Sequence, residues 1–179
     1  DIHIVAALGL HRRMTDSELK HVVGRRVFSD YHTDRLYNHD AEDKDNIVLV
    51  CESSLVEVVE LPKRVVDSDL LFYVNVNLVA MDGGHKSINT GMITYRTLRG
   101  HHNVKTLIHS TSYIDPPNSA LHHSVGRMGA VVEEQVKVFK IETTLNSTTF
   151  PAPLRHLQKQ EREWQPWEKA IFALNRHSM

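Results

Sequence analysis

Residues 2–24 read IHIVAALGLHRRMTDSELKHVVG, and this stretch decides the fold class. Its first eight residues form a largely apolar, β-branched run, which is typical of a strand in the middle of a parallel sheet. Thr15 and Glu18 then have the spacing of a capping box, so a helix is expected to begin there and to end at Gly24. A strand, a short loop and a helix in this order make a βα unit, which predicts an α/β protein.

The rest of the chain extends this pattern. Further strands are expected at 47–51, 56–60, 70–76, 106–109 and 139–144, and helices at 62–66, 92–102 and 119–136, with residues 81–87 as a loop. We therefore expect a Rossmann-like, mainly parallel sheet with helices on both faces.

The domain organisation follows from the two ends of the chain. A buried strand seldom opens a protein, so the 179 residues are expected to be a fragment of a larger two-domain protein. Residues 1–146 are predicted to form one α/β domain, truncated at its N-terminus. Residues 147–179 contain prolines, a charged run and two tryptophans, and are predicted to form an extended arm and a terminal helix.

Composition excludes several classes of protein. Lys and Arg total 21 against 22 Asp and Glu, so no basic field is present to hold nucleic acid. No apolar run approaches the roughly 20 residues of a membrane span, and the first residues do not read as a signal peptide. Cys51 is the single cysteine and fits a reducing compartment. We expect a cytoplasmic protein whose 13 histidines favour metal or proton chemistry.

Three short motifs could carry that chemistry. Residues 9–12 (GLHR) follow the first strand, where α/β proteins hold ligands. Residues 82–87 (DGGHKS) contain a glycine pair that lets the backbone approach a ligand, although the P-loop pattern is absent. His101 and His102 end the next helix, and at most one of them can face the same site as Lys86. Taken singly, these are more simply a loop histidine, a tight turn and a polar helix end.

In order and spacing, the three motifs resemble the lactate racemase catalytic subunit family. GLHR follows the first strand, Lys86 closes a Gly-Gly loop, and His102 lies 16 residues after that lysine. Further matches are residues 14–19 (MTDSEL), 37–40 (YNHD) and 62–66 (PKRVV), within a resemblance that runs from about residue 4 to residue 146. The tail beyond it resembles the longer, uncharacterised branch of the family.

The resemblance implies a cofactor. In this family a nickel-pincer nucleotide, derived from nicotinic acid, is tethered through a thioamide to the lysine that matches Lys86. Gly83, Gly84 and Arg12 are the residues implied to help bind it. Soft sulfur donors with one imidazole suit nickel, and His102 is implied as the protein ligand.

The resemblance also implies an activity. His11 matches the histidine that takes the hydroxyl proton of a small 2-hydroxy acid while hydride leaves the α-carbon for the cofactor ring. Return of hydride to the other face inverts the centre, so the implied enzyme is an isomerase, a 2-hydroxy acid racemase or epimerase, with Lys86 and His11 as catalytic residues. Its implied partners are the substrate and the cofactor maturation enzymes. Whether the protein forms a homo-oligomer is left open.

One departure from the family concerns the second base that racemisation needs. The family has a histidine ten residues before the lysine, whereas this chain has Val76, flanked by Asn75 and Asn77. Candidates for the missing base are His85, His101 and His109. A water held by one of the two asparagines could serve as well, and the substrate is left open.

Two other functions compete with this interpretation. One is a histidine-rich zinc hydrolase that draws ligands from His11, His85, His101 and His102, although the His-Glu-x-x-His motif is missing. The other is a non-catalytic homologue that has lost the cofactor, which the absent second histidine favours.

Overall fold

The computed structural model describes residues 1–53, 55, 57–79, 81–145 and 148–175. The strands in these residues are β1 (Ile4–Ala6), β2 (Leu36–Asn38), β3 (Ile47–Glu52), β4 (Val58–Pro62), β5 (Leu71–Asn77) and β6 (Val138–Thr144). The α-helices are α1 (Asp16–Val23), α2 (Arg25–Tyr31), α3 (Lys63–Val66), α4 (Gly84–Gly91), α5 (Tyr95–His101), α6 (Val104–Ile108), α7 (Ala120–Gln135) and α8 (Pro166–Asn175). Short 3-10 turns lie at Pro116–Asn118, Ala152–Gln158 and Glu161–Glu163.

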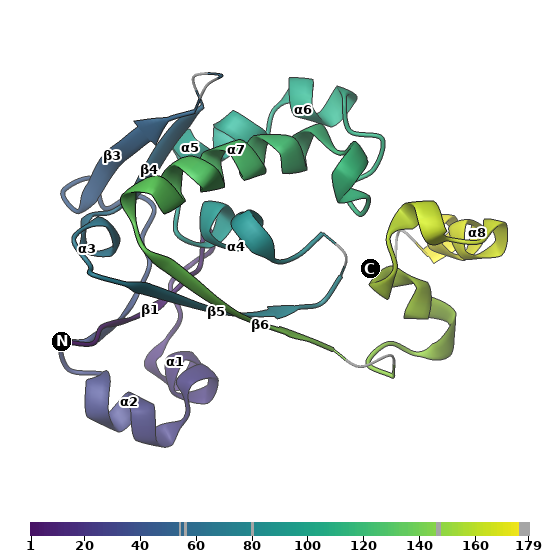
Figure 1. The fold of residues 1–179 in the computed structure, drawn as a ribbon. Coiled ribbons are helices and arrows are strands. Elements are labelled where there is room, and N and C mark those ends of the chain that lie inside the picture. Colours follow the sequence, from purple (N-terminus) through teal and green to yellow (C-terminus); the bar gives the residue numbers. More distant parts are fainter. Residues whose placement is uncertain (54, 56, 80, 146–147, 176–179) are drawn as a thin grey trace.

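The strands pair in twos. β1 pairs with β2 and β5 pairs with β6, both in parallel, and β3 and β4 form an antiparallel hairpin. Helices α4 and α7 and the β3–β4 hairpin lie on one side of the β5–β6 ladder, and α1 and α2 lie on the other side (Figure 1). The predicted α/β class with mainly parallel pairing is confirmed, and within the described residues the three pairs are separate two-stranded ladders.

The first βα unit forms as the sequence predicts. The Thr15 hydroxyl accepts a hydrogen bond from the Glu18 N–H, and the Glu18 carboxylate accepts one from the Thr15 N–H at 2.8 Å. Arg12 adds a bidentate ion pair, which together with these bonds lowers the pKa of Glu18 to about 2. The helix ends at Gly24, whose φ of 85° glycine adopts without the steric penalty that a Cβ would bring.

Two predicted boundaries are wrong. Residues 106–109 are not a strand, because Asn103 and Thr106 cap each other's backbone and begin α6. The predicted loop at 81–87 is too long, because residues 84–87 already belong to α4, whereas the predicted helix at 92–102 is confirmed as α5 with a later start. The chain leaves the helical conformation between them, and Thr94 starts α5 by accepting a bond from the Thr97 N–H.

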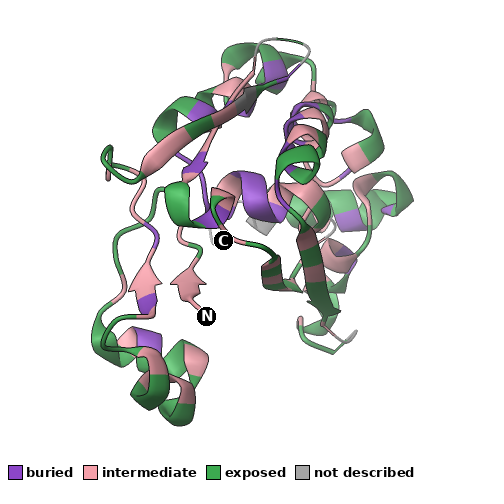
Figure 2. Ribbon diagram, turned by 60° about the vertical axis from the view of Figure 1, so that its left-hand side comes forward, coloured by how far each residue is buried: buried purple, intermediate pink, exposed green. Residues whose placement is uncertain are grey.

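The core lies between the β3–β4 hairpin and helices α4 and α7. Its buried members are Val59, Leu61, Val65, Ile88, Met92, Ile93, Met128 and Val132. The Asn89 amide ties the two helices together, because it donates to the carbonyl oxygens of His85 and Val125. Gly129 permits their close approach, since a Cβ there would overlap the His85 side chain. Helix α4 is therefore held rigidly, whereas α1 and α2 bury only Leu19 (Figure 2).

The β5–β6 ladder is covered on one face only. Along β5 the side chains alternate between partly buried and exposed, and the exposed set includes Phe72, Val74 and Val76. Phe139 and Ile141 of β6 stand beside them in register. Asn75 and Asn77 point the other way, toward α4, because β-strand side chains alternate with a period of two.

The C-terminal segment has a small cluster of its own around Trp164. The indole ring packs edge-on against His156 and lies beside Phe172 of α8. A hydrogen bond from the Glu161 N–H to the Ile114 carbonyl links the segment to the loop before α7. No helix among the described residues is long and apolar enough to cross a membrane.

Gly9 joins the first loop to the end of α4, and its replacement is expected to be costly. Its N–H donates to the Gly91 carbonyl at 2.8 Å, its φ is 57°, and a Cβ would overlap the Thr90 carbonyl oxygen. Gly9→Ala should therefore lose about 1–2 kcal/mol from the left-handed backbone and about 1–3 kcal/mol more from the overlap. Gly84→Ala is the matched control, because its φ is also 57° and nothing lies within 4 Å of a Cβ there. If both variants lost the same free energy of unfolding in urea, the predicted overlap with the Thr90 carbonyl would be contradicted.

Glu57 makes stability depend on pH. Burial alone would raise the pKa of Glu57, but hydrogen bonds from Arg127, Ser124 and Ser53 outweigh it, and the pKa lies below the ordinary glutamate value. The stabilisation is therefore complete above the unfolded-state pKa and is lost as the pH falls through the folded-state pKa. Glu57→Gln should cost about 1–3 kcal/mol at pH 7 and flatten this acid slope in urea unfolding. An unchanged slope in the variant would contradict the assignment.

Candidate functional site

The loop before α4 is shaped by two glycines. Gly83 has a φ of 90°, and a Cβ there would lie 2.7 Å from the Asn77 amide nitrogen and 3.0 Å from a Glu142 carboxylate oxygen. Gly84 has a φ of 57°, and its N–H donates to the other Glu142 oxygen at 2.7 Å. The first N–H of α4 is thus satisfied by the protein's own carboxylate.

Lys86 lies in the first turn of α4 with its side chain 19% exposed. Its Nζ donates to Asp82 Oδ1 at 2.8 Å, while Asp82 Oδ2 accepts from the N–H groups of Leu78 and Val79. Burial alone would raise the pKa of Asp82, but the bond and charge of Lys86 lower it overall. The lysine amine is therefore held in one direction by a carboxylate four residues earlier. Asp82 is the first residue of the 82–87 motif, and its i, i+4 spacing to Lys86 is the sequence signal for this ion pair.

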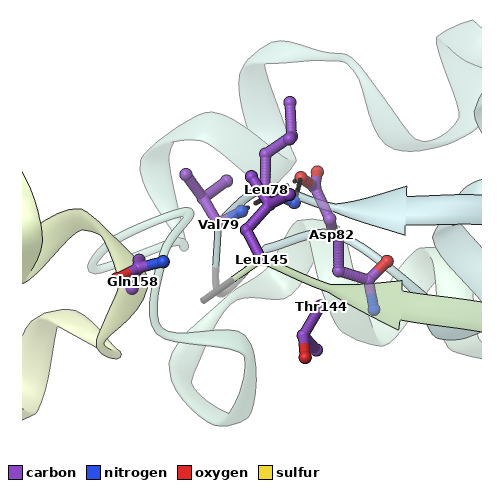
Figure 3. Close-up of a pocket in the computed structure, with 7 residues that line it drawn as sticks. Leu78, Val79, Asp82, Thr144, Leu145 and Gln158 are labelled. Carbon is purple, nitrogen blue, oxygen red and sulfur yellow. Dashed lines mark hydrogen bonds between the residues drawn. The ribbon is translucent and has the colours of Figure 1, made fainter. Parts of the chain in front are cut away.

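Asp82 stands between two pockets. The first, of about 250 Å³, lies at the carboxyl ends of β5 and β6 and is lined by Asn77, Leu78, Val79, Asp82, Thr144, Leu145 and Gln158 (Figure 3). The second, of about 280 Å³, contains the glycine pair, Lys86 and residues from α7. Ligand sites in α/β proteins typically lie at this end of the strands.

His122 lines the second pocket and lies outside the three short motifs. It comes from α7, and its Nε2 lies 3.3 Å from the Met81 carbonyl oxygen. Burial lowers the pKa of His122, and the positive charge of Lys86 lowers it further. The long helix therefore supplies an imidazole beside the lysine, which the helical pattern of residues 119–136 alone could not reveal.

His102 also lies within electrostatic reach of Lys86. It is the C-terminal cap of α5, and burial followed by the charge of Lys86 lowers its pKa. Its Nδ1 lies 2.7 Å from Nδ1 of His101, which is fully buried and contacts the Asn89 carbonyl through Nε2. Burial lowers the pKa of His101 to about 4. The two adjacent rings thus have different surroundings, and the charge of Lys86 acts on His102.

The first loop places His11 and Arg12 differently. His11 lies in an exposed turn next to Gly9, and no described residue forms a hydrogen bond with its imidazole. Because Gly9 bonds to Gly91, this turn lies against the last residues of α4. The Arg12 guanidinium instead turns toward α1 and pairs with Glu18.

The three histidines considered as a second base have other partners. His85 lies 3.2 Å from Glu133 on α7, and His101 is enclosed in the core. His109 is exposed and bonds the Lys105 carbonyl of its own helix. Val76 lies on the open face of β5, 47% exposed, so a side chain at that position points away from α4.

The asparagines that flank Val76 point toward α4. Asn75 donates to Ser87 of α4 at 3.2 Å and to the Asn77 oxygen at 2.9 Å. Polar amides therefore line the strand face next to the lysine-bearing helix.

The metal-binding capacity of the site is limited. Across the described ranges, no group of three or more His, Cys, Asp or Glu side chains is arranged to hold a metal ion. A catalytic zinc site needs three protein ligands, so the zinc hydrolase lacks its ligand set in this part of the chain. A metal that takes most of its donors from a cofactor needs only one imidazole. The fixed Lys86, the glycine pair and the exposed imidazole of His102 fit a group of that kind.

Comparison with known proteins places these observations in a family. The family model of the lactate racemase N-terminal domain matches residues 1–115. The lactate racemase apoprotein from Thermoanaerobacterium thermosaccharolyticum has a similar structure, with a TM-score of 0.64, 19% sequence identity, and coverage of 82% of this chain and 35% of that one. The chain thus spans about a third of the length of that solved protein, and the similarity concerns the fold. No curated protein matches the sequence.

Proposed function

Because this chain belongs to the lactate racemase N-terminal domain family, we propose that it is the cofactor-carrying part of a 2-hydroxy acid racemase or epimerase. The observation that carries the proposal is the placement of Lys86. Its amine is held by Asp82, opens beside a pocket, and lies close enough to His102 to lower the pKa of that imidazole. A tether and a metal ligand must lie close together, and the electrostatic effect of Lys86 on His102 supports this arrangement.

The chain's residues fit a lysine-tethered nickel-pincer nucleotide. When bound, this group supplies a hydride acceptor next to nickel, which the protein's own side chains cannot supply. Lys86 would hold it through a thioamide, and His102 would be the protein ligand of nickel. Asp82 Oδ2 would keep the bonds from the Leu78 and Val79 N–H groups once the lysine has lost its charge. Separate maturation enzymes would have to supply the group.

The anion of such a nucleotide would not rest on the first N–H of α4, because Glu142 already occupies it. Two like charges at one helix terminus would repel each other. Arg12 can contribute to anion binding only by leaving Glu18. The phosphate is therefore expected at another part of the pocket edge.

The protein's role in turnover is proton transfer and orientation. The His11 imidazole has no hydrogen-bond partner among the described residues, so a ring nitrogen can take the hydroxyl proton of a 2-hydroxy acid. On the strand side, the amides of Asn75 and Asn77 point toward α4 and can hold a water that carries a proton. Such a water would lie on the α4 face of β5, opposite to the face on which the Val76 side chain stands.

A racemisation assay in heavy water tests the proposal. The full chain is produced together with the cofactor-synthesis enzymes and is given single enantiomers of lactate and of larger 2-hydroxy acids. We expect at least one acid to be interconverted while its α-carbon keeps its own hydrogen, because hydride returns to the carbon it left. Deuterium at the α-carbon would show an ordinary deprotonation instead, and inversion of none of the acids would favour the non-catalytic homologue.

His102→Ala is expected to separate the tether from the metal. The adduct on Lys86 should persist, whereas nickel should be lost to a chelator more than about 100-fold faster, because loss of the ligand itself should exceed the roughly 10–100-fold cost of losing an outer-shell partner. The ratio of nickel by elemental analysis to adduct by intact mass measures this. His109→Ala is the matched control, since that histidine is exposed and bonds its own helix. Equal nickel retention in both variants would contradict the ligand assignment.

A further inference from the structure

His101 and His102 form a direct contact whose protons can be assigned. His101 Nε2 lies 3.0 Å from the carbonyl oxygen of Asn89. A carbonyl oxygen only accepts hydrogen bonds, so His101 Nε2 must carry a hydrogen. The ring is fully buried, and no carboxylate among the described residues is hydrogen-bonded to it. Since a buried charge without a partner is costly, His101 is neutral and its Nδ1 is an acceptor.

The second ring follows from the first. The two Nδ1 atoms are 2.7 Å apart, and one of them must donate. Because His101 Nδ1 has only a lone pair, His102 Nδ1 carries the hydrogen. In the neutral ring, Nε2 of His102 is then left unprotonated, which is the form in which imidazole binds a metal.

We propose that His101 is a positioning residue for His102, which it holds in the tautomer and orientation that leave Nε2 free to bind a metal ion. The inference deepens the proposed function, since nickel is the metal in question. Histidine ligands are commonly fixed in this way through their second ring nitrogen, usually by a carboxylate or a backbone carbonyl. Here a second histidine performs that task.

The contact also ties His102 to the helix that bears the tether. Asn89, which accepts the bond from His101, lies on α4 three residues after Lys86. Its own amide is bonded to the carbonyl groups of His85 and Val125. The Thr106 hydroxyl in turn donates to the His101 carbonyl at 2.7 Å. The direction of His102 is therefore set relative to Lys86 through a short chain of buried hydrogen bonds.

The tautomer can be measured without any cofactor. Long-range proton–nitrogen spectra of the ¹⁵N-labelled, unloaded full chain should show His102 protonated at Nδ1 and bare at Nε2. His101→Gln should preserve this signature, because one amide can donate to the Asn89 carbonyl and accept from His102. His101→Phe has neither group and should shift His102 toward a mixture of tautomers. A wild-type His102 protonated at Nε2 would overturn the inference.

Nickel retention supplies the second readout. In loaded protein, His101→Phe should lose nickel to a chelator roughly 10–100-fold faster than the wild type, and His101→Gln should stay near the wild-type rate. His39→Phe is the matched control, because His39 is also buried with Nε2 on a backbone carbonyl, that of Ile93, at 2.9 Å. Equal retention in both phenylalanine variants would overturn the inference.

The two readouts also separate this inference from the proposed function. If His101→Phe does not fold, the wild-type tautomer and the glutamine variant decide the outcome. A wild type that accepts no adduct would overturn the proposed function, while the tautomer of the unloaded protein would still decide whether His101 sets His102.

Discussion

Lys86→Arg is expected to give a folded protein that accepts no adduct and has no turnover. Arginine keeps a positive charge beside Asp82, so the ion pair at the start of α4 can be retained. A guanidinium stays protonated in proteins and is not an acyl acceptor, so it cannot form the thioamide. Intact mass and thermal unfolding should therefore show an unmodified protein with near-native stability and complete loss of activity.

Lys86→Ala is the companion variant, because it also removes the ion pair. It should lose the adduct as well and should in addition lose about 1–3 kcal/mol of stability, because Asp82 is left partly buried without its cation. Lys105→Arg, on an exposed position of α6, is the matched control and should accept the adduct normally. An adduct of the same mass on Lys86→Arg would rule out the lysine as the attachment point.

His11→Ala should have the second-largest effect, a loss of roughly 10²–10⁴-fold in kcat, which is the usual contribution of a general base. Adduct and nickel should both be retained, because His11 is neither the tether nor the metal ligand in this account. Stability should stay within about 0.5 kcal/mol of the wild type, since the side chain is exposed and has no hydrogen-bond partner among the described residues.

The control for His11 is another exposed histidine away from the site. His32 pairs with Asp16 and stacks on Phe28, so His32→Ala should leave kcat unchanged. Full turnover in His11→Ala would remove this residue from proton transfer and leave another group, such as His122 of the lysine pocket, to be tested.

The local parts of the fold could be predicted from sequence. The capping box of Thr15 and Glu18, the end of α1 at Gly24 and the long helix α7 all depend on residues within a few positions of one another. The capping box of Asn103 and Thr106 was equally readable, and it explains why 106–109 is helical. The start of α4 could not be predicted from neighbouring residues, because its first N–H is satisfied by Glu142, 58 residues further along the chain.

The candidate site divides in the same way. The resemblance carried by the glycine pair, Lys86 and His102 predicts that the lysine and the histidine share a site, and this stays a prediction that is compatible with the effect of the Lys86 charge on the pKa of His102. The surroundings depend on distant contacts that no local pattern encodes. The bond from His101 to Asn89 and the approach of His122 to Met81 both arise from the packing of separate helices. Sequence alone therefore indicates which residues to consider and cannot assign their partners.

The most direct test of the account is the mass of the peptide that contains Lys86, taken from the full chain made together with the cofactor-synthesis enzymes, with nickel measured in the same sample. The account predicts a mass increase confined to Lys86 and about one nickel per adduct. An unmodified Lys86 in protein from a host that loads another member of the family would contradict it.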